Sequence, residues 1–249
     1  MLARFVVARQ ALADRLSWLG GLAMGLFSSV LVLTVLRDLV LLLANKPSLA
    51  APTAIAVLAL ASLFTLIGYV NARRVARIVR VDIPLTNLPD ELAGFTIVQL
   101  SDIHVGPTIK REYVQAIVDR VNQLDADLVA ITGDVVDGSV AQLRAHTAPL
   151  GSLRTRHGSY VVTGNHEYYA GATAWMLEFE RIGLRGLHNR HVVISHRGAR
   201  FVLAGVTDYS AAAFDAAQAS DPAAALAGSR SLTISWYLHN HSSRTVVCG

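Results

Sequence analysis

The chain of 249 residues has few charged side chains and only one cysteine. Asp, Glu, Lys and Arg make up 16% of the residues, where a soluble domain has about 25%. Because 53% of the residues are hydrophobic, this shortage excludes a disordered protein and argues against a purely cytosolic globule. The single Cys248 excludes an intrachain disulfide and a cysteine-based metal site, and it leaves the redox compartment open.

The charge that is present is divided unevenly along the chain. Residues 1–80 carry nine Arg or Lys against two Asp, a net charge of +7. Residues 81–249 carry thirteen basic residues against sixteen acidic ones, a net charge of −3. A basic protein often binds nucleic acid, but here the positive charge lies in the most hydrophobic third of the chain. We therefore expect a basic membrane segment over residues 1–80, a soluble domain after it, and no nucleic-acid partner.

Two uncharged apolar runs predict transmembrane helices. Residues 18–36 and 52–70 would each span about 28 Å as a helix, close to the hydrocarbon thickness of a bilayer. Residues 39–44 either extend the first helix or lie at the membrane interface. The alternatives are a buried hairpin of a soluble protein and a signal peptide cleaved near residues 48–50. Both runs contain small residues that suit helix–helix contact in lipid: Gly20, Gly21, Gly25, Ala54, Ala56, Ala59 and Ala61.

Arginines flank the two runs on their outer sides, whereas the connection between the runs has only two basic residues. The positive-inside bias then places both outer sides in the cytoplasm. This predicts a multi-pass membrane protein, with membrane lipids as partners and a cytoplasmic soluble domain. The flanking arginines are Arg4, Arg9, Arg15, Arg73, Arg74, Arg77 and Arg80.

Strand-like and helix-like segments alternate over residues 94–249, after a linker over residues 81–93 that contains Pro84 and Pro89. This alternation predicts an α/β domain with a partly parallel sheet. A hairpin is expected over residues 192–204 with Gly198 in its turn, and Ala-rich residues 211–227 predict a helix or a loop. The other strands are expected at residues 95–100, 128–132 and 160–163, and the helices at 110–124, 139–150 and 172–182.

A polar cluster directly follows each of these three strands. Ligands of open α/β sheets bind at the carboxyl ends of the strands, so we expect the three clusters to converge. An Asp and a His two residues apart in an extended chain project to the same side, and Gly133 and Gly164 permit sharp turns. Asp, His and Asn donors suit Mn, Fe or Zn. The clusters are Asp102-Ile103-His104, Gly133-Asp134-Val135-Val136-Asp137-Gly138 and Gly164-Asn165-His166-Glu167.

Each cluster alone has a simpler explanation. Asp-x-His occurs freely in surface loops, Gly-Asp-x-x-Asp-Gly is typical of turns, and Asn165 could cap a helix. Turn chemistry does not explain all three clusters in this order, each at the end of a strand. The sequence therefore predicts a metal site at one edge of the sheet.

The three clusters resemble the first three motifs of the calcineurin-like metallophosphoesterase superfamily. The strings Gly164-Asn165-His166-Glu167-Tyr168-Tyr169 and Gly205-Val206-Thr207-Asp208-Tyr209, with the apolar helices, resemble its membrane-anchored bacterial branch. The resemblance implies a β-sandwich flanked by helices, two divalent ions (Mn, Fe or Zn) and a phosphoester substrate.

The resemblance also implies a role for each matching residue. Asp102 and His104 would hold the first ion, Asp134 would bridge both ions, and Asn165 would bind the second. His166 would be the general acid or the group that stabilises the transition state. Outside the ligand shell, Asp137 and Glu167 would orient histidines.

This chain departs from the family in lacking a late Gly-His-x-His motif. The nearest match is His239-Asn240-His241, after the strand-like residues 232–238. His239 is the candidate late histidine ligand, and we expect His241 to be a surface residue. Because the composition changes after Ser229, we also expect a truncated or frame-shifted version of the family's C-terminal part.

The leading hypothesis is a membrane-anchored phosphoesterase that cleaves phosphoester or pyrophosphate bonds. A lipid-linked substrate such as UDP-2,3-diacylglucosamine, from lipid A biosynthesis, is one candidate. The alternative is a catalytically inactive family member without the late ligands, and a third possibility is a membrane-anchored binding module.

Overall fold

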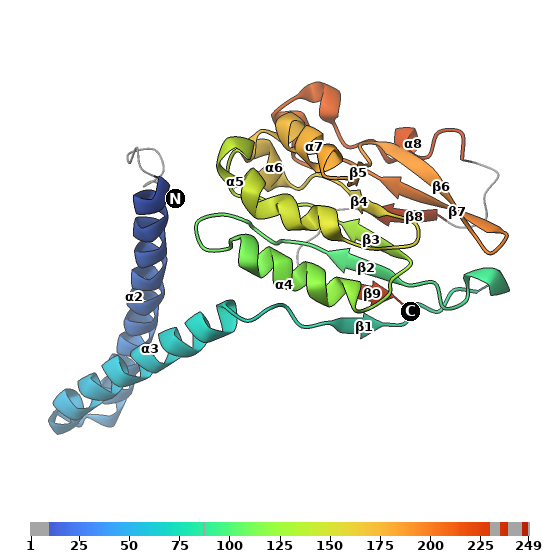
Figure 1. The fold of residues 1–249 in the computed structure, drawn as a ribbon. Coiled ribbons are helices and arrows are strands. Elements are labelled where there is room, and N and C mark those ends of the chain that lie inside the picture. The colour runs from blue at the N-terminus through green and yellow to red at the C-terminus, as the bar shows by residue number, and fades with distance from the viewer. Residues whose placement is uncertain (1–9, 87, 230–234, 239–245, 249) are drawn as a thin grey trace. The chain divides into compact units, whose positions relative to one another are not determined.

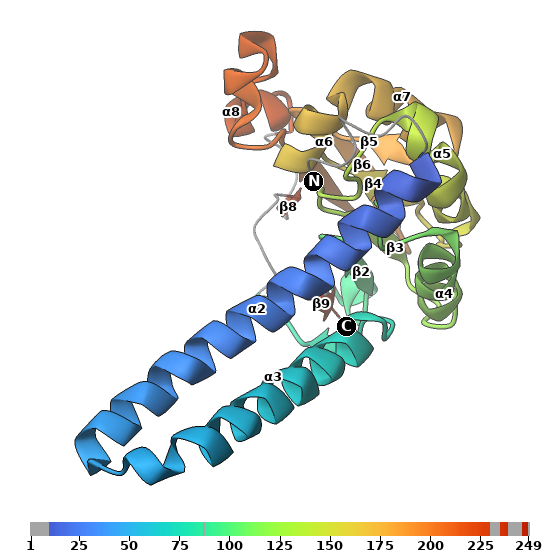
Figure 2. The same ribbon diagram turned by 90° about the vertical axis from the view of Figure 1, so that its left-hand side faces the viewer.

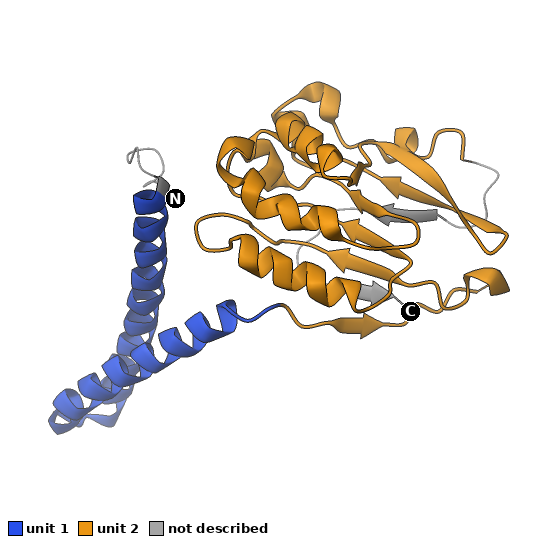
Figure 3. Ribbon diagram, in the orientation of Figure 1, with its two compact units in different colours: residues 1–75 blue, residues 76–249 orange. Residues whose placement is uncertain are grey.

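The chain forms two compact units, Met1–Val75 and Ala76–Gly249 (Figure 3). The computed structural model describes residues 10–86, 88–229, 235–238 and 246–248.

The first unit is a pair of long apolar helices joined by a short turn (Figure 2). Helix α2 spans Gln10–Ala44, η1 spans Pro47–Leu49 and α3 spans Ala50–Ala72. Both helices are long and apolar enough to cross a membrane by length and composition, each with a mean hydropathy of 2.2 in its most apolar stretch. Helix α2 continues without a break to Ala44, so residues 39–44 extend the first helix, as the first of the two alternatives proposed.

Contacts between α2 and α3 involve fewer small residues than the sequence suggested. The rings of Trp18 and Tyr69 meet edge to face at 5.9 Å, and Ala61 is fully buried. The Arg37 guanidinium donates to the Thr53 hydroxyl at 3.0 Å and to the Ala50 carbonyl at 2.8 Å. A Cβ atom added at Gly20, Gly21 or Gly25 would meet nothing within 4 Å, so these three glycines do not contact α3.

The second unit is a sandwich of two sheets. The larger sheet has the order β1-β9-β2-β3-β4-β5, and β2, β3, β4 and β5 are parallel to one another. The smaller sheet has the order β6-β7-β8, with an antiparallel β6–β7 hairpin. The strands are β1 Val79–Val81, β2 Ile97–Leu100, β3 Leu128–Ile131, β4 Ser159–Val161, β5 Arg185–Gly186, β6 Arg190–His196, β7 Ala199–Gly205, β8 Ser235–Leu238 and β9 Val246–Cys248.

Helices lie along the outer side of the larger sheet (Figure 1). Helix α4 shows why: Val114, Ile117, Val118 and Val121 recur at helical spacing and are all buried. The helices of this unit are α4 Arg111–Asn122, α5 Val140–Thr147, α6 Asn165–Ala170, α7 Ala172–Arg181 and α8 Pro222–Ala225, with 3-10 turns η2 Asp90–Leu92, η3 Ala148–Ser152, η4 Ala211–Ala213 and η5 Ala216–Gln218.

The core between the two sheets is apolar and fully enclosed. Leu128 and Tyr160 of the larger sheet share one buried cluster with Ile194, Phe201 and Leu203 of the smaller sheet. Each buried large side chain stabilises such a core by roughly 1.5–3 kcal/mol relative to exposure. The expected α/β fold, a β-sandwich flanked by helices, is therefore confirmed.

Two segments differ from their predicted form. The expected linker over residues 81–93 contains the end of strand β1 and the turn η2. The Ala-rich segment forms three short helical turns because local caps divide it: Asp215 accepts from the Ala217 N–H at 3.0 Å, and Asp221 accepts from the Ala224 N–H at 2.8 Å.

Candidate metal centre

The three polar clusters lie side by side because they follow the adjacent parallel strands β2, β3 and β4. Main-chain hydrogen bonds join the first two loops: the His104 N–H donates to the Asp134 carbonyl at 3.0 Å, and the Asp137 N–H donates to the Val105 carbonyl at 2.8 Å. The third loop joins through the His166 N–H, which donates to Asp134 Oδ1 at 3.0 Å. The predicted convergence is therefore confirmed.

The local backbone is not the extended chain that we expected. Asp102, His104 and Asp134 all adopt the left-handed region, with φ of 56°, 51° and 53°. This conformation is uncommon for residues other than glycine, although Asp, Asn and His tolerate it best. Such backbone strain concentrates at functional sites. The two side chains of Asp102 and His104 converge through these turns, not through the alternation of a strand.

Gly133 allows the second and third loops to touch. Its φ of +89° favours glycine, and an added Cβ would collide with the Gly164 nitrogen and lie 2.6 Å from Gly164 Cα. Gly164 itself has an ordinary extended backbone, with φ of −98°. The expected need for a sharp glycine turn therefore holds at Gly133 and not at Gly164.

Asp102, His104 and Asp134 form a cluster whose ligand atoms lie within 4.8 Å of one another. His104 Nε2 is 3.9 Å from Asp102 Oδ1, and Asp102 also contacts the Ser101 hydroxyl. Two carboxylates and one imidazole suit a divalent transition metal, so the residues present fit a cation.

Asn165 lies against the same carboxylate. With its amide nitrogen turned toward Asp134, Asn165 donates to both carboxylate oxygens at 3.1 Å. A cation beside Asp134 would favour the opposite orientation, in which the amide oxygen faces the charge. The structure therefore brings Asn165 against Asp134, one of the three clustered side chains.

Asp137 contacts two histidines with a single oxygen. Its Oδ1 lies 3.1 Å from His104 Nδ1 and 2.6 Å from His166 Nδ1, and the two rings are 4.5 Å apart. The hydrogen bond from Asp137 raises the pKa of His104 against the effect of burial, and the charges of Asp137, Asp134 and Asp102 add to the rise. Burial would raise the pKa of Asp137, but the two histidines outweigh burial and lower it.

Glu167 differs from its predicted role, because its hydrogen bonds go to the backbone and not to a histidine. The fully buried carboxylate accepts four N–H groups, at 2.7 to 3.2 Å. Burial raises its pKa to about 7, against the backbone donors that favour the charged form. Glu167 therefore joins the second and third loops. Its donors are Asp134, Val135, Val136 and Gly164.

The late histidine prediction stays untested. His239 and His241 lie outside the described residues.

Residues 95–215 match the calcineurin-like phosphoesterase family model. The chain contains a calcineurin-like phosphoesterase domain. It is 43% identical to a transmembrane protein with metallophosphoesterase domain from Danio rerio, over 58% of this chain and 34% of that protein. A protein of the same name from Bos taurus is 39% identical, over 60% of this chain and 35% of the relative.

A bacterial relative is also similar: an uncharacterized metallophosphoesterase from Helicobacter pylori is 36% identical, over 58% of this chain and 37% of its own length. The chain thus spans about a third of the length of these three relatives.

The phosphoesterase domain has an aromatic surface beside His166 that the sequence analysis did not assign to the site. Tyr169 is 71% exposed, and its ring lies 6.1 Å from His166 and 5.1 Å from Phe214. Phe214 also stacks on the ring of Tyr168 at 5.5 Å. The pair Tyr168-Tyr169 directly after Glu167 was the available signal, but exposed aromatics have no periodicity that marks them as functional.

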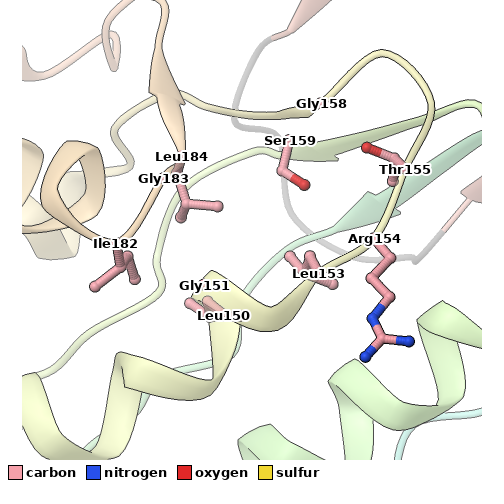
Figure 4. A pocket seen from close by; sticks show the side chains of 10 residues that line it. All are labelled: Leu150, Gly151, Leu153, Arg154, Thr155, Gly158, Ser159, Ile182, Gly183 and Leu184. Atoms are coloured by element: carbon pink, nitrogen blue, oxygen red, sulfur yellow. The ribbon is translucent and has the colours of Figure 1, made fainter.

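A cavity of about 330 Å³ lies elsewhere in the domain (Figure 4). None of the predicted site residues lines it, so it is not part of the candidate metal centre. Its lining consists of Leu150, Gly151, Leu153, Arg154, Thr155, Gly158, Ser159, Ile182, Gly183 and Leu184.

Proposed function

We propose that this domain is a metal-dependent hydrolase of phosphoester or pyrophosphate bonds. The observation that carries the proposal is the cluster of Asp102, His104 and Asp134 at one sheet edge, with His166 beside it. The runner-up is an inactive family member that keeps the fold and binds metal weakly. The activity of the whole protein is inferred from this domain.

The chain offers a ligand set for two ions. Asp102, His104 and Asp134 would hold the first, and Asp134 and Asn165 would hold the second, with His239 as a further candidate ligand. When bound, such cations neutralise a phosphoester and lower the pKa of a water molecule. Mn, Fe and Zn all suit these donors.

We infer that His166 donates the proton that the leaving group needs. Because its Nδ1 is bonded to Asp137, Nε2 is the nitrogen that can reach a substrate. Its side chain is 28% exposed, which leaves access from solvent. As the oxygen of water attacks phosphorus, the water would release one proton to solvent, the bond to the leaving oxygen would break, and protonated His166 would donate its proton to that oxygen.

One assay tests the proposal. The full chain in detergent is supplied with Mn²⁺ and bis-p-nitrophenyl phosphate, beside the Asp134→Ala and His166→Ala variants. We expect both variants to lose at least about 100-fold in turnover, the size of a lost general acid or charge stabiliser. His191→Ala is the control, because His191 contacts only the Ala225 carbonyl among the contacts described.

Turnover that needs no metal, or that survives both substitutions, would overturn the enzyme proposal. Absent turnover together with one or no bound ion by elemental analysis would favour the inactive alternative.

The finer substrate proposal is a lipid-linked phosphoester, with UDP-2,3-diacylglucosamine as a candidate. It is supported by the exposed ring of Tyr169 next to His166, by the exposed ring of Phe214 against Tyr169, and by the two apolar helices. Aromatic side chains can pack against acyl chains or stack on a base. Tyr169→Ala and Phe214→Ala should raise KM for an acylated phosphodiester in micelles and leave KM for a short soluble phosphodiester unchanged. Equal effects on both substrates would exclude a role in recognising the lipid.

We further propose a multi-pass location in a bacterial inner membrane with the domain in the cytoplasm. The flanking arginines support this orientation. In intact spheroplasts, trypsin added outside should leave the domain uncut, and lysis should expose it. Cleavage before lysis would reverse the orientation.

A further inference from the structure

A second cluster of metal-binding side chains lies at the other edge of the larger sheet. Asp127 immediately precedes β3, His157 comes two residues before β4, and His196 ends β6. The candidate metal centre follows the carboxyl ends of β3 and β4, so this cluster lies at their amino ends. Because β6 belongs to the smaller sheet, the cluster contains residues from both sheets.

The three side chains stand close enough to share one ion. His157 Nε2 is 2.9 Å from His196 Nδ1, and His196 Nδ1 is 4.0 Å from Asp127 Oδ1. One ligand atom from each residue lies within 4.8 Å of the others. Two ligands of a tetrahedral zinc ion, each about 2.0–2.1 Å from the metal, are about 3.3 Å apart. The observed distances bracket this value, so small side-chain movements would suffice.

Surrounding residues hold the cluster in place. Asp127 Oδ2 accepts from the Thr96 N–H at 2.9 Å, which leaves Oδ1 facing His196. Phe95 stacks on His157 at 5.5 Å and meets His196 edge to face at 5.0 Å. Asp127 and His196 are both buried, at 8% and 4% exposure. Because these side chains are already fixed by packing and hydrogen bonds, they lose little conformational entropy when they bind an ion, whereas mobile surface side chains lose more.

Arg156 is the group that competes with a cation. Its guanidinium lies 3.1 Å from Asp127 Oδ1, but the Arg156 side chain is 57% exposed. Because the Arg156 side chain is mostly exposed, its guanidinium can turn into solvent when a cation takes its place beside Oδ1, and the buried carboxylate of Asp127 then keeps a positive partner. His157 is half-buried and gives the cluster a side open to solvent.

We propose that Asp127, His157 and His196 bind one transition-metal cation, Zn²⁺ in the first place, at a site separate from the phosphoesterase centre, where solvent supplies the fourth ligand. Two imidazoles and one carboxylate are borderline donors that suit Zn²⁺, whereas Ca²⁺ and Mg²⁺ prefer oxygen ligands alone. The bound ion ties the start of β3 and β4 to the end of β6. It stabilises the sandwich by mass action and takes part in no reaction.

The competing explanation is a hydrogen bond between two neutral imidazoles beside an Asp127–Arg156 ion pair. A measurement of metal binding distinguishes this explanation from the proposed zinc site. The full chain in detergent carries Asp102→Asn, Asp134→Asn and Asp137→Asn, which remove the carboxylates of both groups of possible ligands at the candidate metal centre. It is saturated with Zn²⁺, passed through gel filtration and analysed for zinc. We expect one zinc ion per chain and, with Co²⁺ instead, the visible absorption of a tetrahedral site.

Three further substitutions in that background decide the outcome. His157→Gln should abolish the retained zinc and the rise in Tm that zinc produces, whereas His157→Cys, which supplies another zinc ligand, should keep both. His191→Gln is the matched control and should retain zinc. The proposal fails if the parent retains no zinc or if His157→Gln retains as much as the parent. His157→Cys keeps the test valid even where His157→Gln does not fold.

Discussion

The Nδ1 atom of His166 lies 2.6 Å from Oδ1 of Asp137. The same oxygen lies 3.1 Å from Nδ1 of His104. One carboxylate therefore fixes the tautomer and the ring position of both a candidate metal ligand and the candidate proton donor. The two proposed functions of the site therefore depend on one side chain, that of Asp137.

Asp137→Asn should lower kcat/KM by about 10–100-fold, because substitution of such an outer partner typically costs this much in metal affinity or activity. The matched control is Asp119→Asn on α4, where the exposed carboxylate accepts from Gln115 at 2.8 Å. Kinetics at saturating and limiting Mn²⁺ measure both effects. A variant that keeps wild-type kinetics at both concentrations would contradict this role.

The position of the site could be predicted from the sequence, but its backbone could not. Strand order follows from short apolar runs, and parallel neighbours place Asp102, Asp134 and His166 at one edge. The left-handed turns at Asp102 and His104 leave no such pattern, because one φ angle depends on contacts with residues more than thirty positions away. The hydrogen-bond partners of Glu167 could not be predicted for the same reason, because three of the four N–H donors lie more than thirty residues away in the sequence.

Glu167→Gln should lower the free energy of unfolding by about 2–5 kcal/mol. Each oxygen of Glu167 accepts two N–H groups, so the amide nitrogen of Gln would face two donors and leave them unpaired. A buried unpaired donor costs about 1–3 kcal/mol. Chemical denaturation of the apo chain measures this. The control is Glu180→Gln, where the exposed side chain has only a 3.5 Å contact with Arg190 among those described.

Gly133→Ala should disrupt the candidate metal centre. The new Cβ would lie 2.6 Å from Gly164 Cα while φ stays at +89°, so the second and third loops must separate. The expected result is a loss of metal-dependent turnover together with a lower Tm. Gly198→Ala in the hairpin turn is the control: its φ is also positive, at +100°, but an added Cβ meets nothing within 4 Å. Equal losses of turnover in both variants would mean that backbone strain, and not the contact with Gly164, explains the effect.

The regular elements were easier to predict than the edges of the sheet. Helix α4 falls within the predicted residues 110–124. The prediction rests on side chains that recur at helical spacing, namely Tyr113, Ile117, Val121 and Leu124. Strands β1 and β5 have three and two residues, too few for any alternation to appear. Their pairing is determined by the neighbouring strands and not by their own sequence.

Metal binding at the candidate centre should weaken as the pH falls, and the decline should begin above pH 6.5. A hydrogen bond and charge from Asp137 raise the pKa of His104, and a protonated imidazole cannot bind a cation. In the absence of metal the sign is opposite: a raised pKa in the folded state contributes stability below pH 6.5, which is lost as the pH rises through the folded value. Calorimetric titration with Mn²⁺ across this range measures the affinity and the protons released.

Asp137→Asn provides the decisive comparison, because it removes the largest cause of the raised pKa of His104. As the pH rises, the Mn²⁺ affinity of this variant should reach its plateau at a lower pH than in the wild-type chain. The plateau affinity itself should be lower than that of the wild-type chain. If the two profiles are parallel, His104 does not control the pH dependence, and another ligand must titrate in its place.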